Sequence, residues 1–198
     1  MSATHHVPPA PAVLRLVQEL VFGRWRASGE DLYREVAAVL DAGAGQEVLV
    51  SGCGDGTSAE WLAQRTGAAV TGVDPDAEHV EAAEERLREG GAKWPLSFQQ
   101  ARLDDLPHET AVFDAAVGEP VIAAAADPAR AVAELVRVTK PMGAVVLLQL
   151  TWSSDISRDG RELLVERLGM RPHLLVEWKQ MLRDAGVVDL HEIGRAHV

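Results

Sequence analysis

The sequence contains a single cysteine, Cys53, which excludes an internal disulfide and any cysteine-rich zinc site. It also lacks a long apolar run: the longest, at 143–150, is far shorter than the ~20 residues that a helix needs to cross a bilayer. The N-terminal stretch MSATHHVPPAPAV has neither the basic flank nor the apolar core of a secretory signal. We therefore expect a cytoplasmic protein with no membrane partner.

Basic residues are scarce relative to acidic ones. The chain has 19 Lys and Arg against 30 Asp and Glu, which gives a formal net charge of −11. Such a surface repels nucleic acid, so we expect no nucleic-acid partner. Apolar residues make up 47% of the 198 residues, which is ample for the core of one domain.

The most informative stretch is 47–63, EVLVSGCGDGTSAEWLA. The apolar run Val48–Val50 is typical of a strand buried in a parallel sheet. Three glycines follow it, Gly52, Gly54 and Gly56. Thr57 and Glu60 predict a capping box that begins a helix ending before Gly67. A strand, a glycine loop and a helix N-terminus in succession predict a nucleotide-type site, because the loop offers close backbone approach and free N–H groups.

The remaining pattern alternates between helices and strands. Helices are predicted near 13–21 and over 30–42, 57–66, 76–88, 159–168 and 174–185, with a further helix from Pro128 behind an Asp127 cap. Strands are predicted over 48–50, 69–73, 97–100, 113–117, 143–150 and 187–192. This alternation predicts an α/β fold with a doubly wound, mostly parallel sheet.

The second predicted strand ends in TGVDPD, which places Asp74 18 residues after Gly56. A carboxylate at this position can accept hydrogen bonds from both hydroxyls of a ribose, as it does in dinucleotide-binding folds. The glycine spacing differs from G-x-G-x-x-G, however, and no P-loop lysine is present. The pattern therefore favours a nucleoside without phosphates.

Three segments, VLVSGCGDG, TGVDPD and ELVRVTKPMGAVVLL, resemble the class I S-adenosylmethionine-dependent methyltransferases. The resemblance covers 47–150 and is greatest to the ubiquinone/menaquinone-type small-molecule methyltransferases. It implies a Rossmann-like sheet, S-adenosyl-L-methionine as cofactor, and methyl transfer to a small-molecule acceptor. It also implies one domain: a disordered tail (1–10), N-terminal helices (11–43), a cofactor-binding core (44–150) and a substrate-side segment (151–198).

The same resemblance assigns the site residues, and no metal is expected. The cofactor would contact the glycine loop, the end of the second strand, the loop after the third strand and the end of the fourth: Gly52, Cys53, Gly54, Asp55, Gly56, Asp74, Pro75, Leu103, Asp104 and Gly118. Glu119 follows the fourth strand at the edge where open α/β sheets bind ligands, so it is the candidate catalytic or substrate-facing carboxylate.

Two positions depart from the family. Val50 stands where the family usually has an acidic residue that supports the methionine end of the cofactor. Arg102 lies in the family's Gly-Asp-Ala position, and a guanidinium cannot accept a hydrogen bond from the adenine amino group. The Leu103 backbone N–H remains available to the ring, and Asp104 is the nearest acceptor.

Other polar and aromatic residues favour structural roles. Cys53 is expected to be a small packing residue, Asp114 a structural carboxylate and His108 a surface histidine. Trp25 and Trp152 are candidates for core or pocket packing.

Two other function classes remain open. One is a module of the same fold that binds the cofactor without transferring its methyl group, and the other is a nicotinamide-dependent oxidoreductase. The family's seventh strand, which runs antiparallel, has too little sequence left in 193–198. We therefore expect a C-terminally truncated sheet whose fifth strand is unpaired at its edge or covered only by 187–192.

Overall fold

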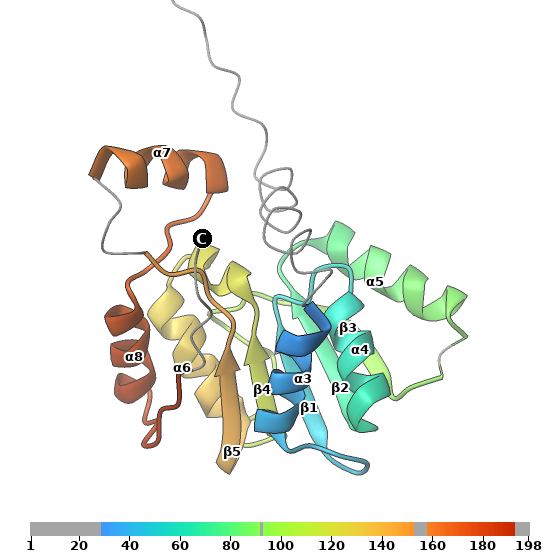
Figure 1. Ribbon diagram of the computed structural model, residues 1–198. Helices are drawn as coiled ribbons and strands as arrows, with labels where there is room; N and C mark the ends of the chain where they lie inside the picture. The colour runs from blue at the N-terminus through green and yellow to red at the C-terminus, as the bar shows by residue number, and fades with distance from the viewer. Residues whose placement is uncertain (1–28, 92, 153–157, 193–198) are drawn as a thin grey trace, which may run out of the picture.

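The computed structural model describes residues 29–91, 93–152 and 158–192 (Figure 1). Within them lies one five-stranded sheet in the order β3-β2-β1-β4-β5, and every neighbouring pair is parallel. The strands are β1 (Glu47–Ser51), β2 (Ala69–Asp74), β3 (Leu96–Gln100), β4 (Phe113–Gly118) and β5 (Thr139–Leu147). The predicted α/β, Rossmann-like fold is confirmed.

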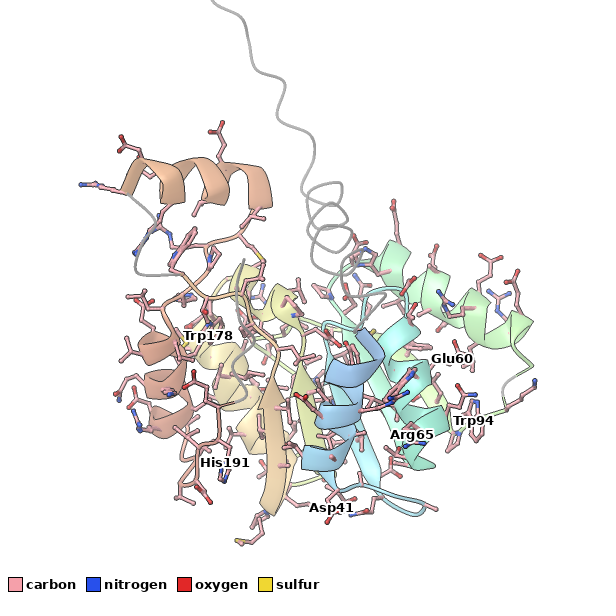
Figure 2. The ribbon with its side chains drawn as sticks, viewed as in Figure 1. Asp41, Glu60, Arg65, Trp94, Trp178 and His191 are labelled. Carbon is pink, nitrogen blue, oxygen red and sulfur yellow. The ribbon has the colours of Figure 1, made fainter. Side chains whose placement is uncertain are left out.

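Helices cover both faces of this sheet (Figure 1). They are α3 (Gly29–Leu40), α4 (Thr57–Thr66), α5 (Ala77–Glu89), the 3-10 helix η2 (Pro120–Ala124), α6 (Pro128–Val138), α7 (Arg158–Leu168) and α8 (Leu175–Asp184). On one face α3 and α4 bury side chains such as Val36 and Leu62 against Val50. On the other face α6 and α8 bury Leu135 and Trp178, and Figure 2 shows Trp178 on the inner side of α8.

Helix caps follow the sequence only in part. Asp127 caps α6 as predicted, accepting a hydrogen bond from the Arg130 backbone N–H at 3.0 Å. Asp76, predicted as the first helical residue, is instead the cap of α5 and accepts from the Glu78 backbone N–H at 2.9 Å. The predicted capping box of Thr57 and Glu60 is wrong. The cap of α4 is Gly56, whose φ of 78° turns the chain directly into the helix, with no side-chain cap. Thr57 is therefore already helical, and its hydroxyl donates to Asp55 Oδ1 at 2.7 Å.

The amino edge of the sheet is held together by Asp114 of β4. Its carboxylate accepts hydrogen bonds from the Glu47 backbone N–H of β1 and from Lys140 Nζ of β5, both at 2.8 Å. It lies at the edge opposite the glycine loop, in agreement with a structural role.

The C-terminal segment differs from the prediction. The strand predicted at 187–192 is wrong, because Val188 is 98% exposed and the Val187 N–H donates to Leu182 O, which prolongs the turn after α8. Within the described residues β5 is an edge strand with half-buried side chains, as expected for an unpaired edge. The missing seventh strand stays a prediction. The predicted tail (1–10), the helix near 13–21 and 193–198 lie outside the described residues.

Candidate active site

The loop from Gly52 to Gly56 leaves β1 at the carboxyl edge of the sheet. The N–H groups of Gly52 and Cys53 both donate to Val73 O of β2, at 2.7 and 3.0 Å. Gly52 has a φ of 84°, and a Cβ there would collide with the Val121 side chain. A Cβ on Gly54, by contrast, would meet no protein atom within 4 Å. The backbone at Gly54 is therefore open to an approaching ligand.

Asp74 ends β2 beside this loop and is only 3% exposed. Its Oδ2 accepts a hydrogen bond from the Gly54 N–H at 2.9 Å. Its Oδ1 accepts from the Asp76 N–H at 3.0 Å and lies 3.1 Å from His79 Nδ1. Each carboxylate oxygen has two lone pairs, so capacity remains for a ligand hydroxyl. The exposed Pro75 follows at the same edge.

Glu119 follows β4 at the same carboxyl edge and is 6% exposed, so its carboxylate does not point into bulk solvent. It accepts hydrogen bonds from the Tyr33 hydroxyl of α3, at 2.5 Å, and from the Ser58 side chain of α4. Burial raises the pKa of Glu119, against the effect of these two donors. Burial and the Glu119 charge likewise raise the pKa of Tyr33.

Sequence reasoning did not identify the partners of Glu119. Tyr33 and Glu119 are 86 residues apart in the chain. A signal was nevertheless present: Tyr33 is the single tyrosine of the chain and shares a helix face with Val36 and Leu40 at helical spacing.

In the segment after β3, Leu103 and Asp104 are buried. Arg102 donates from Nε and an Nη to both oxygens of Asp104, at 3.1 and 2.9 Å. The nearest acceptor for an adenine amino group is thus already paired with the residue that departs from the family pattern.

Protein contacts explain two further predicted positions, Asp55 in the glycine loop and Gly118 at the end of β4. The Asp55 side chain faces outward to Arg86 of α5, 3.1 Å from its Nη2. Burial would raise the pKa of Asp55, but hydrogen bonds from Thr57 and Arg86 lower it overall. At Gly118 a Cβ would lie 2.7 Å from Leu147 and 2.8 Å from Leu135, so close packing requires glycine.

Neither Cys53 nor His108 is placed for chemistry at the loop. Burial, reinforced by the charges of Asp74 and Glu119, raises the pKa of the Cys53 thiol far above neutrality. A protonated thiol is a poor nucleophile, in agreement with the predicted packing role. His108 packs edge-on against Phe113 at the amino end of β4, with ring centroids 5.0 Å apart. Burial and the charge of Arg137 lower its pKa. Trp25 lies outside the described residues.

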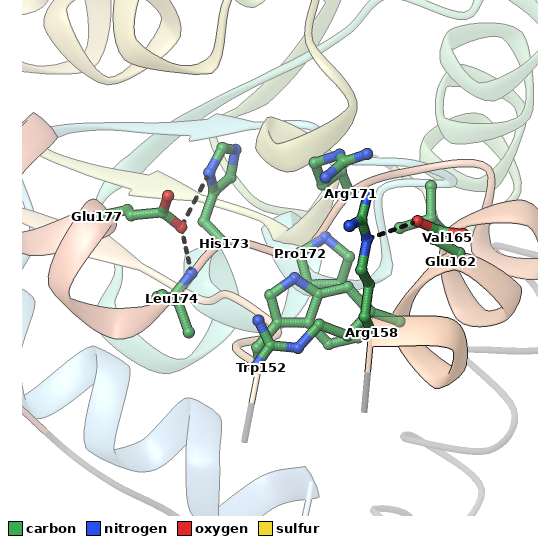
Figure 3. Close-up of a pocket in the computed structure, with 10 residues that line it drawn as sticks. Trp152, Arg158, Glu162, Val165, Arg171, Pro172, His173, Leu174 and Glu177 are labelled. Atoms are coloured by element: carbon green, nitrogen blue, oxygen red, sulfur yellow. Dashed lines mark hydrogen bonds and ion pairs between the residues drawn. The ribbon is translucent and has the colours of Figure 1, made fainter. Parts of the chain in front are cut away.

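A cavity of about 400 Å³ lies beyond the carboxyl end of β5, between α7 and the start of α8 (Figure 3). The backbone N–H of Trp152 donates to the backbone oxygen of His173 at 3.1 Å, which joins the two segments that frame the cavity. The Arg161 guanidinium lies 5.6 Å from the centre of the Trp152 ring. Trp152 therefore lines a pocket, one of the two roles predicted for it.

The described residues contain no group of three or more His, Cys, Asp or Glu side chains that could hold a metal ion. None of the helices in this part of the chain is long and apolar enough to cross a membrane.

Comparison with known proteins assigns the chain to a family. The methyltransferase domain family matches residues 49–147, from β1 to β5. The chain belongs to this family. The resemblance to class I S-adenosylmethionine-dependent methyltransferases is thereby confirmed, and the comparisons give no support to an oxidoreductase or a non-catalytic module.

Individual relatives agree with this assignment. The methyltransferase GfsG of Streptomyces halstedii is 32% identical over 62% of this chain and 44% of its own length. The ubiquinone biosynthesis O-methyltransferase of Methylocella silvestris is 28% identical over 92% of this chain and 68% of its own length. The crystal structure of the YcgJ protein from Bacillus subtilis superimposes with a TM-score of 0.69 at 26% identity, covering 77% of this chain and 66% of that one. The chain thus spans less than half the length of GfsG.

Proposed function

We propose that this protein transfers a methyl group from S-adenosyl-L-methionine to a small-molecule acceptor. One observation carries the proposal: in a chain of the methyltransferase family, the open backbone at Gly54 and the buried carboxylate of Asp74 lie within one hydrogen bond of each other. An open glycine backbone beside a ribose-binding carboxylate is the combination that a nucleoside ligand requires.

The residues present fit the cofactor. Asp74 would accept hydrogen bonds from the ribose hydroxyls, the open backbone at Gly54 would lie against the ligand, and the Leu103 backbone N–H would be available to the adenine ring. When bound, S-adenosylmethionine supplies a methyl group on a sulfonium, which is already a good leaving group. The protein's task is then to align the acceptor and to exclude water.

The acceptor enters from the β5 side, where the cavity beside Trp152 offers an aromatic wall and arginine side chains. The Methylocella relative is named an O-methyltransferase, which favours a hydroxyl oxygen as the atom that is methylated. Such an acceptor loses a proton during transfer, so a base or solvent must accept it.

A turnover assay tests this function. Purified protein is incubated with S-adenosylmethionine and a panel of small hydroxylated aromatic acceptors, and release of S-adenosylhomocysteine is measured. We expect turnover with at least one acceptor, and lower turnover for Asp74→Ala at a cofactor concentration that does not saturate the variant. Tight cofactor binding without turnover on any acceptor would favour the non-catalytic module. Binding of NADH without S-adenosylmethionine would favour the oxidoreductase.

A further inference from the structure

The family position for a carboxylate on β1 is occupied by Val50, which is fully buried among Val36, Leu62 and other apolar side chains. Val50 pairs in register with Val117 of β4. Side chains alternate along a strand, and register partners share a face. Glu119, two residues beyond Val117, therefore projects from the same face as Val50, one strand further along the sheet.

The contacts of Glu119 agree with this placement. Tyr33 and Ser58, its hydroxyl partners, come from α3 and α4, the two helices that cover the Val50 face. A Cβ on Gly52 would lie 3.3 Å from the Glu119 Cβ, so Glu119 borders the glycine loop at its first glycine. Loop and carboxylate thus form one site.

Within 29–91, 93–152 and 158–192, no Lys, Arg or His side chain forms an ion pair with Glu119. Its hydrogen-bond partners among the described residues are both neutral hydroxyls, although the side chain is only 6% exposed. A buried carboxylate is costly unless a positive charge accompanies it. The site is therefore suited to a ligand that brings its own cation.

The order of the strands indicates which end of the ligand meets Glu119. Asp74 on β2 and Leu103 beyond β3 lie on one side of β1, whereas Glu119 on β4 lies on the other. A nucleoside with its ribose at Asp74 and its adenine toward Leu103 must direct its 5′ substituent toward β4. In S-adenosylmethionine this substituent is the methionine chain, which carries an ammonium group.

We infer that Glu119 binds the α-ammonium group of the methionine chain, so that the carboxylate absent from β1 is supplied by β4. This inference rests on the proposed function. An ammonium donates hydrogen bonds and a sulfonium does not, so the ammonium is the cation that a carboxylate paired with hydroxyls recognises. Glu119 is then a ligand-binding residue rather than the base of the reaction.

Calorimetric titration of wild type and Glu119→Gln tests the inference with three ligands. S-adenosylhomocysteine keeps the ammonium without the sulfonium charge, its deaminated analogue lacks the ammonium, and methylthioadenosine lacks the whole amino acid end. We expect Glu119→Gln to weaken S-adenosylhomocysteine at least tenfold, and to leave the deaminated analogue and methylthioadenosine within about twofold. The preference of wild type for S-adenosylhomocysteine over the deaminated analogue should disappear in the variant.

The control is Glu60→Gln, a carboxylate on the side of α4 that faces α5 (Figure 2), which should change none of the three affinities. Equal weakening of all three ligands by Glu119→Gln, or no weakening of S-adenosylhomocysteine, overturns the inference while the proposed function stands. S-adenosylmethionine is titrated as a fourth ligand: if Glu119→Gln weakens it and leaves S-adenosylhomocysteine unchanged, Glu119 pairs with the sulfonium and the inference is also overturned. Wild type that binds none of the ligands refutes the proposed function itself, and the inference with it.

Discussion

Asp74 and Gly54 are joined by a hydrogen bond of 2.9 Å from the Gly54 N–H to Asp74 Oδ2. The carboxylate predicted to hold the ribose therefore also holds the glycine loop against the end of β2. Asp74 thus both positions the glycine loop and is predicted to bind the ligand, so substitutions of this residue must be designed to separate the two roles.

Asp74→Asn should separate them. The amide oxygen can still accept the Gly54 hydrogen bond, but the charge is lost. Asp74→Ala loses both the charge and the hydrogen-bond acceptor. We expect it to weaken S-adenosylhomocysteine binding by roughly 1.5–3 kcal/mol. Asn should lose less affinity than Ala and keep a thermal unfolding temperature near that of wild type. Calorimetry and thermal unfolding measure the two effects. Unchanged affinity in both variants would contradict the ribose assignment.

The loop glycines should respond differently to alanine. At Gly52 a Cβ meets Val121, at a φ of 84°, so Gly52→Ala should destabilise the fold by about 1–3 kcal/mol. At Gly54 the space is open and the φ of 53° lies in the left-handed helical region, so Gly54→Ala should cost only about 1–2 kcal/mol. The methyl group introduced by Gly54→Ala would instead lie in the open space where the ligand is expected to bind. Urea unfolding should show the larger loss of stability for Gly52→Ala, and calorimetry the larger loss of ligand affinity for Gly54→Ala. The reverse order would place the ligand elsewhere.

Glu119 should make stability depend on pH. Its pKa is raised by burial, so the folded protein holds this proton to a higher pH than the unfolded chain does. The resulting stability is present below the unfolded pKa of about 4.3 and is lost as pH rises through the folded pKa. Tyr33 and Cys53, its titratable neighbours, have raised pKa values and stay protonated in this window. Glu119→Gln does not titrate there.

The stability of the variant relative to wild type should therefore increase from pH 4 to pH 8. Urea unfolding of both proteins across this range measures it. A difference that is constant with pH would mean that Glu119 is not buried as an acid. With the ligand-binding role inferred above, ionisation of the same residue would lower stability while it increases affinity.

The strands and most helices could be predicted because their apolar periodicity is local. The α4 cap could not, because the left-handed Gly56 overrides the sequence preference of Thr57 and Glu60. The prediction of a strand at 187–192 was wrong because this segment packs onto α8 and not alongside β5. The Lys179–Glu192 ion pair, at 2.6 Å, is one of these contacts. For the candidate site, the motif predicted that Asp74 ends the second strand, and the structure has it there. The pairing of Glu119 with Tyr33 depends on tertiary contacts that no local pattern encodes.

Arg102 provides the last prediction. Its guanidinium is largely exposed, yet it donates two hydrogen bonds to the buried carboxylate of Asp104. While this pair persists, each Asp104 oxygen already accepts one hydrogen bond and the guanidinium offsets the carboxylate charge, so Asp104 is a weaker acceptor for an adenine amino group. Arg102→Met removes the donors and keeps an unbranched side chain, so both Asp104 oxygens become fully available to the amino group.

We expect Arg102→Met to bind S-adenosylhomocysteine several-fold more tightly and to discriminate against S-inosylhomocysteine, in which an oxygen replaces the amino group. Wild type should discriminate less, because its acceptor is weakened by the hydrogen bonds from Arg102. The double variant Arg102→Met with Asp104→Asn is the control and should lose the gain, since an amide is a weaker acceptor than a carboxylate. Competition calorimetry with the two ligands measures the ratio. If Arg102→Met instead weakens both ligands equally, Arg102 itself contacts the nucleoside, and the departure from the family pattern is a binding device.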